Sequence, residues 1–96
     1  MAFPDQVTGT ASLTGSGQTY DIRPSAGEEW IIHNIFFNKG IHIYMTDGTN
    51  LVPLRVFAHG WFWEWLSFHV NNTRFIRLKT IRTGTTLVGF DGVQSK

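Results

Sequence analysis

The sequence predicts an all-β fold, an antiparallel β-sandwich or jelly roll of about seven or eight short strands. Apolar residues alternate with a period of two over short runs, and turn-forming residues recur roughly every 8–12 residues. No segment has a helical repeat. Charged residues make up 16% and aromatic residues 15% of the 96 residues. A chain this small cannot easily cover so many rings by itself, so we expect it to associate with a partner or with other copies.

The first 19 residues differ in composition from the rest. They are rich in Thr, Ser, Gly and Ala, and we expect an extended N-terminal arm with room for one short strand, ordered against a neighbour. Residues 20–96 are expected to form the sandwich domain. The start has no basic and apolar leader, and no apolar run approaches the roughly 20 residues of a membrane helix. These features predict synthesis in the cytoplasm and no membrane partner.

The strands expected in the domain are residues 20–23, 30–37, 41–46, 51–57, 60–70, 73–80 and 85–90. The turns between them contain Gly, Asn or Pro, and Asn38-Lys39-Gly40 and Asp47-Gly48 indicate tight hairpins. Another turn is expected at Ala58-His59-Gly60. Pro53 lies inside an expected strand, which favours a sheet edge or a β-bulge there.

The most unusual stretch is Gly60–Val70. Alternation places Trp61, Trp63 and Trp65 on one face, together with Ser67 and His69, whereas the other face is apolar except for Glu64. Both faces therefore carry large apolar side chains that must be shielded from water. A buried carboxylate requires a partner, so we expect Glu64 to form a structural ion pair with an arginine, Arg77 in preference to Arg55 or Arg74.

The sequence shows no catalytic or metal centre. His33 and His42 flank the expected hairpin and could lie close together, but no third ligand has matching spacing. A small enzyme that uses this pair is therefore a rival hypothesis rather than the expected function, and no cofactor is implied. The basic residues between Arg74 and Arg82 divide between two faces, and eight Lys and Arg balance seven Asp and Glu. This charge pattern disfavours a nucleic-acid partner.

The aromatic residues suggest two binding roles. The first is an interface with other subunits or with a large partner surface, for which the candidates are Trp30, Phe36, Phe37, Trp61, Trp63, Trp65 and His69. The second is a glycan-binding platform of Trp61, Trp63 and Trp65, which would span about 13 Å along one strand.

Several segments resemble small virion proteins of tailed bacteriophages over about residues 20–93. The segments are Tyr20-Asp21-Ile22-Arg23-Pro24, Gly27–Ile35, Tyr44–Thr49, Asn71–Lys79 and Val88-Gly89-Phe90-Asp91-Gly92. The resemblance implies a β-sandwich or jelly roll on the capsid exterior, with the major capsid protein and further copies of the chain as partners. It favours a trimer and carries no catalytic residues.

The sequence therefore predicts a non-enzymatic structural protein of the virion, a capsid decoration (cement) protein that stabilises the shell. The alternative is a glycan-binding adhesin or a tail or fibre component that uses the three tryptophans.

Overall fold

Seven antiparallel strands form the fold in the computed structural model, which describes residues 5–95. The strands are β1 (Asp5–Thr14), β2 (Thr19–Ile22), β3 (Glu29–Thr46), β4 (Leu51–Trp63), β5 (Phe68–Asn71), β6 (Phe75–Thr80) and β7 (Thr85–Gln94). The predicted all-β class is confirmed. Within residues 5–95 there is no helix of the length and apolar character needed to cross a bilayer.

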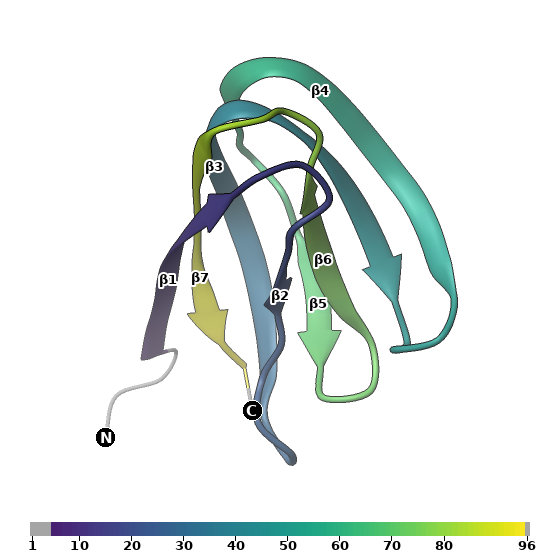
Figure 1. The fold of residues 1–96 in the computed structure, drawn as a ribbon. Helices are drawn as coiled ribbons and strands as arrows, with labels where there is room; N and C mark the ends of the chain where they lie inside the picture. The colour runs from purple at the N-terminus through teal and green to yellow at the C-terminus, as the bar shows by residue number, and fades with distance from the viewer. Residues whose placement is uncertain (1–4, 96) are drawn as a thin grey trace.

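Strand β3 organises the sheet. Its first half, Trp30–Phe37, pairs with β7, and its second half, Ile41–Thr46, pairs with β6. The strand order is β1-β7-β3-β6-β2, while β4 and β5 pair with the other side of β3. The sheet curls until β1 and β2, at the two ends of this order, lie beside each other (Figure 1). The result is a sandwich-like arrangement in which β4 is an edge strand.

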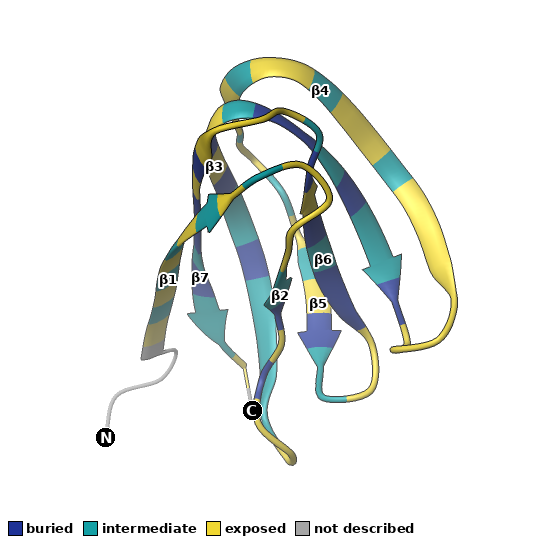
Figure 2. Ribbon diagram, viewed as in Figure 1, coloured by how far each residue is buried: buried dark blue, intermediate teal, exposed yellow. Residues whose placement is uncertain are grey.

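The core lies inside the curl. Its buried apolar residues are Ile22, Ile32, Ile35, Phe37, Ile41, Ile43, Val70, Phe75, Ile76, Leu78, Val88 and Phe90. Most come from β3, β6 and β7, because these strands have neighbours on both sides. Figure 2 shows that β4 is largely exposed along its length. None of the buried core residues therefore comes from β4.

The hairpin predicted at residues 38–40 is absent, because β3 continues through this segment and bends. Residues Lys39 and His59 pair across the bend, so the turn predicted at residues 58–60 is also wrong. Gly40 does not take a positive φ; a Cβ there would lie 2.6 Å from the carbonyl oxygens of both Phe57 and Ala58. Glycine is needed at this position for close approach of β3 and β4 rather than for a tight turn.

The hairpin predicted at Asp47-Gly48 is confirmed, since residues 47–50 connect β3 and β4. Gly48 has φ 97°, and Asp47 Oδ1 accepts hydrogen bonds from the N–H groups of Thr49 and Asn50. Pro53 lies on the edge strand beside a register shift, which confirms the expected edge or bulge.

Residues 5–14 of the predicted N-terminal arm form the strand for which the sequence left room, and this strand, β1, is ten residues long and pairs within the chain. All ten of these residues pair with β7, from Asp5 with Gln94 to Thr14 with Thr85. Val7, Ala11 and Leu13 pack against the core. These few apolar residues among Thr, Ser and Gly give a weak alternating signal in the sequence, and the partner strand is distant along the chain. Residues 1–4 lie outside the described part.

Candidate binding surfaces on the outer face of the sheet

Two adjacent rows of side chains cross the outer face of β7, β3 and β4. Phe36 pairs with Gly89 on one side and with Phe62 on the other, and these three residues form an apolar row. Two residues away along the chain lies a polar row: Asp91 on β7, Asn34 on β3, and Glu64 directly after the end of β4. Residues two apart on a strand share a face, so Asp91 and Asn34 point away from the core as the apolar row does, and Glu64 is exposed.

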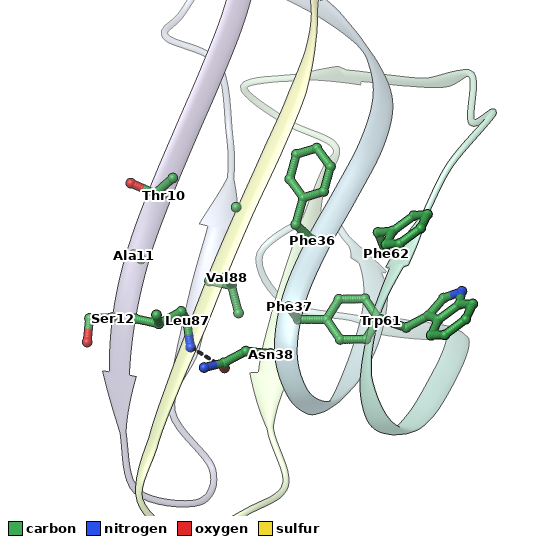
Figure 3. A pocket seen from close by; sticks show the side chains of 11 residues that line it. Thr10, Ala11, Ser12, Phe36, Phe37, Asn38, Trp61, Phe62, Leu87 and Val88 are labelled. Atoms are coloured by element: carbon green, nitrogen blue, oxygen red, sulfur yellow. Dashed lines mark hydrogen bonds between the residues drawn. The ribbon is translucent and has the colours of Figure 1, made fainter.

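The apolar row forms the floor of a groove of about 690 Å³. We call this surface the apolar groove; its lining residues are Thr10, Ala11, Ser12, Phe36, Phe37, Asn38, Trp61, Phe62, Leu87, Val88 and Gly89. None of these residues is charged. Figure 3 shows Phe36, Trp61, Phe62 and Leu87 arranged around the groove.

Four large apolar side chains in the groove are exposed to solvent. The exposed fractions are 42% for Phe36, 46% for Phe62, 52% for Leu87 and 63% for Trp61. The rings of Trp61 and Phe62 stack with their centroids 5.4 Å apart. At the rim, the Leu87 N–H donates a 2.8 Å hydrogen bond to Asn38 Oδ1. The groove is thus an ordered apolar surface that no part of residues 5–95 covers.

The polar row continues into a second depression of about 520 Å³. We call it the polar hollow; it is lined by His33, Asn34, Glu64, Trp65, Leu66 and Ser67. The pairing of β3 with β7 passes from Ile32–Gly92 to Asn34–Asp91, so His33 is the extra residue of a β-bulge. The consecutive residues His33 and Asn34 consequently both line the hollow.

The aromatic stretch of the sequence is interrupted at this hollow. Strand β4 ends at Trp63 and β5 begins at Phe68, so the alternation predicted over residues 60–70 fails after Trp63. Trp65 has φ 64°, unusual for a bulky residue. The Leu66 N–H donates a 2.9 Å hydrogen bond to the His33 carbonyl, which ties the connection to the bulge.

One polar group of the hollow, the Asn34 amide, is held by the sheet. Asn34 Nδ2 donates a 2.7 Å hydrogen bond to Asp91 Oδ1 on β7, which fixes the side chain and leaves its amide oxygen as an acceptor. Glu64 is exposed, and Trp65 is 91% exposed. No Lys or Arg lines the hollow.

The predicted interface residues divide between core and surface. Trp30 stacks on Phe90 with centroids 5.8 Å apart, and Phe37 is 6% exposed. Trp63 packs edge-on against Phe57 and Phe68. These three predicted residues serve the chain's own interior. Phe36 and Trp61 line the apolar groove, Trp65 lines the polar hollow, and His69 is exposed on β5.

The three tryptophans predicted as a glycan platform do not form one surface. Trp61 belongs to the apolar groove, Trp63 is half-buried against aromatic neighbours, and Trp65 lies beyond the end of β4. The platform requires a continuous strand from Trp61 to Trp65, and the backbone leaves the strand conformation between them.

The predicted ion pair between Glu64 and Arg77 is also wrong. Arg77 pairs with Asp21, its register neighbour on β2, through hydrogen bonds of 2.7 Å from Nε and 3.1 Å from Nη2. These contacts raise the pKa of Arg77 above its ordinary value, chiefly through the hydrogen bond to Asp21. Glu64 remains free of any salt bridge among residues 5–95.

The histidines do not converge. His33 and His42 lie on the same strand rather than on facing arms of a hairpin. His42 Nδ1 and the Tyr44 hydroxyl are 2.9 Å apart. Within the described residues, no three His, Cys, Asp or Glu side chains are grouped so that they could hold a metal ion.

Sequence reasoning did not identify Phe62, Leu87, Asn34 or Asp91 as candidate site residues. The last strand was expected over residues 85–90, whereas β7 continues to Gln94 and includes Asp91. The signal for the two rows is the cross-strand register, and the sequence pattern contains no direct measure of it.

No protein-family model matches the chain, and no curated protein matches it in sequence. Among solved structures, the chain is similar to the NLP core of Drosophila, with 17% sequence identity and a TM-score of 0.53. The match covers 94% of this chain and 99% of the Drosophila chain. Pentamer formation and histone binding are described for that protein. At this identity the likeness establishes a shared fold.

Proposed function

We propose that this chain is a structural protein of a phage virion, a decoration protein that binds the outer capsid surface and stabilises the shell. The apolar groove carries the proposal. Its four exposed large apolar side chains, Phe36, Trp61, Phe62 and Leu87, form one contiguous surface. In this role the chain acts by binding and catalyses no reaction.

The composition of the groove suits a protein partner. Aromatic side chains are enriched in the cores of protein interfaces, where charged residues are depleted. The groove has three aromatic side chains among its four large exposed ones and no charged lining residue. An apolar surface of this kind on a free protein promotes association. Both the major capsid protein and another copy of the chain could cover it.

The fold is compatible with assembly into a ring. Pentamer formation is described for the Drosophila NLP core, which has the same fold. We propose a homo-oligomer for this chain, and the trimer favoured by the sequence resemblance remains a prediction. We do not carry histone binding over, because histones are basic and this chain has a net charge of +1.

The test is binding to heads of the encoding phage from which this protein has been deleted. The purified chain should saturate such heads at a stoichiometry set by the capsid lattice. The double variant Phe62→Ser/Leu87→Ser should bind at least ~30-fold more weakly, the loss expected when about 2 kcal/mol of apolar contact is removed. Both side chains are about half exposed in the free protein, so its Tm should change little.

Val52→Ser provides a matched control, because Val52 is 58% exposed on β4 and does not line the groove. This variant should bind like the unmodified chain. Failure of the unmodified chain to bind the heads contradicts the proposed function. Equal binding by the groove double variant and the control shows that the groove is not the capsid contact.

A further inference from the structure

We propose that the polar hollow is a second binding site, independent of the apolar groove, and that it takes a neutral pyranose sugar. In this assignment Trp65 supplies a stacking surface, and Asn34, Glu64 and Ser67 supply hydrogen-bonding groups. The hollow, at about 520 Å³, lies within the range of about 300–1,000 Å³ typical of small-ligand sites.

Trp65 is the first reason for the assignment. Its side chain is 91% exposed, and within residues 5–95 it makes no stacking or edge contact with another ring. Its φ of 64° lies in the left-handed region, which bulky residues rarely occupy. An indole held in water by an unfavourable backbone conformation does little for folding. It offers an apolar face of the kind that packs against the C–H face of a sugar ring.

The backbone around the hollow is the second reason. The β-bulge at His33 and the left-handed Trp65 are joined by the hydrogen bond from the Leu66 N–H to the His33 carbonyl. β-Bulges are over-represented beside functional sites, where they redirect side chains. Here the two irregularities bring His33, Asn34 and Trp65 to one depression.

The polar groups fit the hydroxyl groups of a sugar. The Asn34 amide is oriented by its 2.7 Å hydrogen bond to Asp91, which leaves the amide oxygen free to accept from a hydroxyl group. The Glu64 carboxylate is without a salt bridge among the described residues and is a strong acceptor for two hydroxyl groups. Ser67 can donate and accept.

The charge of the hollow indicates which sugars it takes. Glu64 lines it, and no Lys or Arg does. An anionic sugar would be repelled by the carboxylate and would find no Lys or Arg in the hollow to pair with, so a neutral sugar is favoured. A tightly packed protein partner would also have to desolvate the unpaired carboxylate. A small hydrated ligand therefore suits the hollow better than a second copy of the chain.

The experiment follows the indole N–H signals of the full chain by ¹H–¹⁵N NMR, since its four tryptophans give one signal each. The probes are maltose, lactose, mannobiose and chitobiose, with 3′-sialyllactose as the anionic comparison. At least one neutral disaccharide should shift the Trp65 signal saturably in the millimolar range, and the Trp30 and Trp63 signals should move little.

Two variants of the hollow and two of the apolar groove identify the site. Trp65→Ala should abolish the saturable response of the backbone signals around the hollow, and Glu64→Gln should weaken binding about 10-fold, as loss of a charged hydrogen-bond acceptor predicts. Trp61→Ala is the matched control, because it removes another exposed tryptophan; this variant should weaken capsid binding and keep the sugar response. Phe62→Ser/Leu87→Ser should keep it too, so failure of the capsid proposal is distinguishable from failure of this one.

Four results would overturn the proposal. The first is no saturable shift with any of the neutral disaccharides. The second is tighter binding of 3′-sialyllactose than of lactose, and the third is an unchanged sugar response in Trp65→Ala. The fourth is loss of self-association or capsid binding in Trp65→Ala, which would place Trp65 in a protein interface.

Discussion

The two rows on the outer face lie two residues apart along the chain and have opposite chemistry. In one row, Gly89, Phe36 and Phe62 lie where β7, β3 and β4 pair in regular register, and they line an open apolar groove. In the other, Asp91, Asn34 and Glu64 lie beside a β-bulge and the end of β4. Regular pairing gives a broad surface suited to a protein, whereas the interrupted backbone gives a smaller hollow suited to a small ligand.

The comparison also shows how one short stretch of the chain can line two different surfaces. Strand β4 contributes Trp61 and Phe62 to the apolar groove, and the residues directly after it contribute Glu64 and Trp65 to the polar hollow. The change occurs where the backbone leaves the strand conformation. Variants that separate the two surfaces are therefore more informative than variants that remove the whole aromatic stretch.

The largest expected effect comes from Gly40→Ala at the bend that holds β4 against β3. The new Cβ would lie 2.6 Å from two backbone oxygens of β4, so the strands must separate. We expect a loss of about 3 kcal/mol in the free energy of unfolding and a Tm lower by roughly 12–24 °C. Thermal denaturation measures the loss of stability. Capsid binding and the sugar response should both weaken in this variant, because both surfaces depend on the position of β4.

Gly48→Ala is the control for this variant. Gly48 has φ 97° and open space around its Cα, so alanine there should cost only about 1 kcal/mol through backbone strain. A Tm for Gly40→Ala equal to or above that of Gly48→Ala contradicts close strand approach as the reason for glycine at the bend.

A smaller effect should separate the two rows on β7. Asp91→Ala removes the acceptor of Asn34 Nδ2, and we expect a loss of about 1 kcal/mol, a weaker sugar response at Trp65 and unchanged capsid binding. Gly89→Ala would place a Cβ 2.9 Å from the Gly9 carbonyl oxygen in the floor of the groove. This variant should weaken capsid binding and leave the sugar response at Trp65 unchanged. The same pattern in both variants would mean that the rows are not independent.

The smallest effect concerns the two carboxylates of the ion-pair prediction. Asp21→Asn should lower the free energy of unfolding by about 0.5 kcal/mol, because the pair with Arg77 is partly exposed and surface ion pairs contribute little. Glu64→Gln should leave it unchanged, since Glu64 has no salt bridge in the described residues. Urea denaturation of the two variants measures the difference in the free energy of unfolding. A larger loss for Glu64→Gln than for Asp21→Asn would support the predicted ion pair between Glu64 and Arg77.

Local sequence patterns gave the all-β class and several of the turns. The Asp47-Gly48 hairpin is a two-residue signal, and its geometry needs nothing from the rest of the chain. The edge position of Pro53 follows from its missing N–H. The excess of aromatic rings over what a small chain can bury was also visible in the composition.

The tertiary structure decided which of those rings are covered. Trp30 stacks on Phe90 of the distant strand β7, and Trp63 packs edge-on against Phe68, the first residue of the next strand. The path of β3 through Gly40 is likewise set by contact with β4, and a Gly in a three-residue polar segment looks like a turn in sequence.

The sequence by itself thus determined the strand-forming character of the chain and its high content of aromatic residues, because both depend on residue types and short-range alternation. Only the tertiary structure decided that Phe36 and Phe62 form one surface while Asn34 and Glu64 line another. Strand register and a single left-handed residue, Trp65, set that division. Both are products of pairing between distant segments, which a local pattern does not encode.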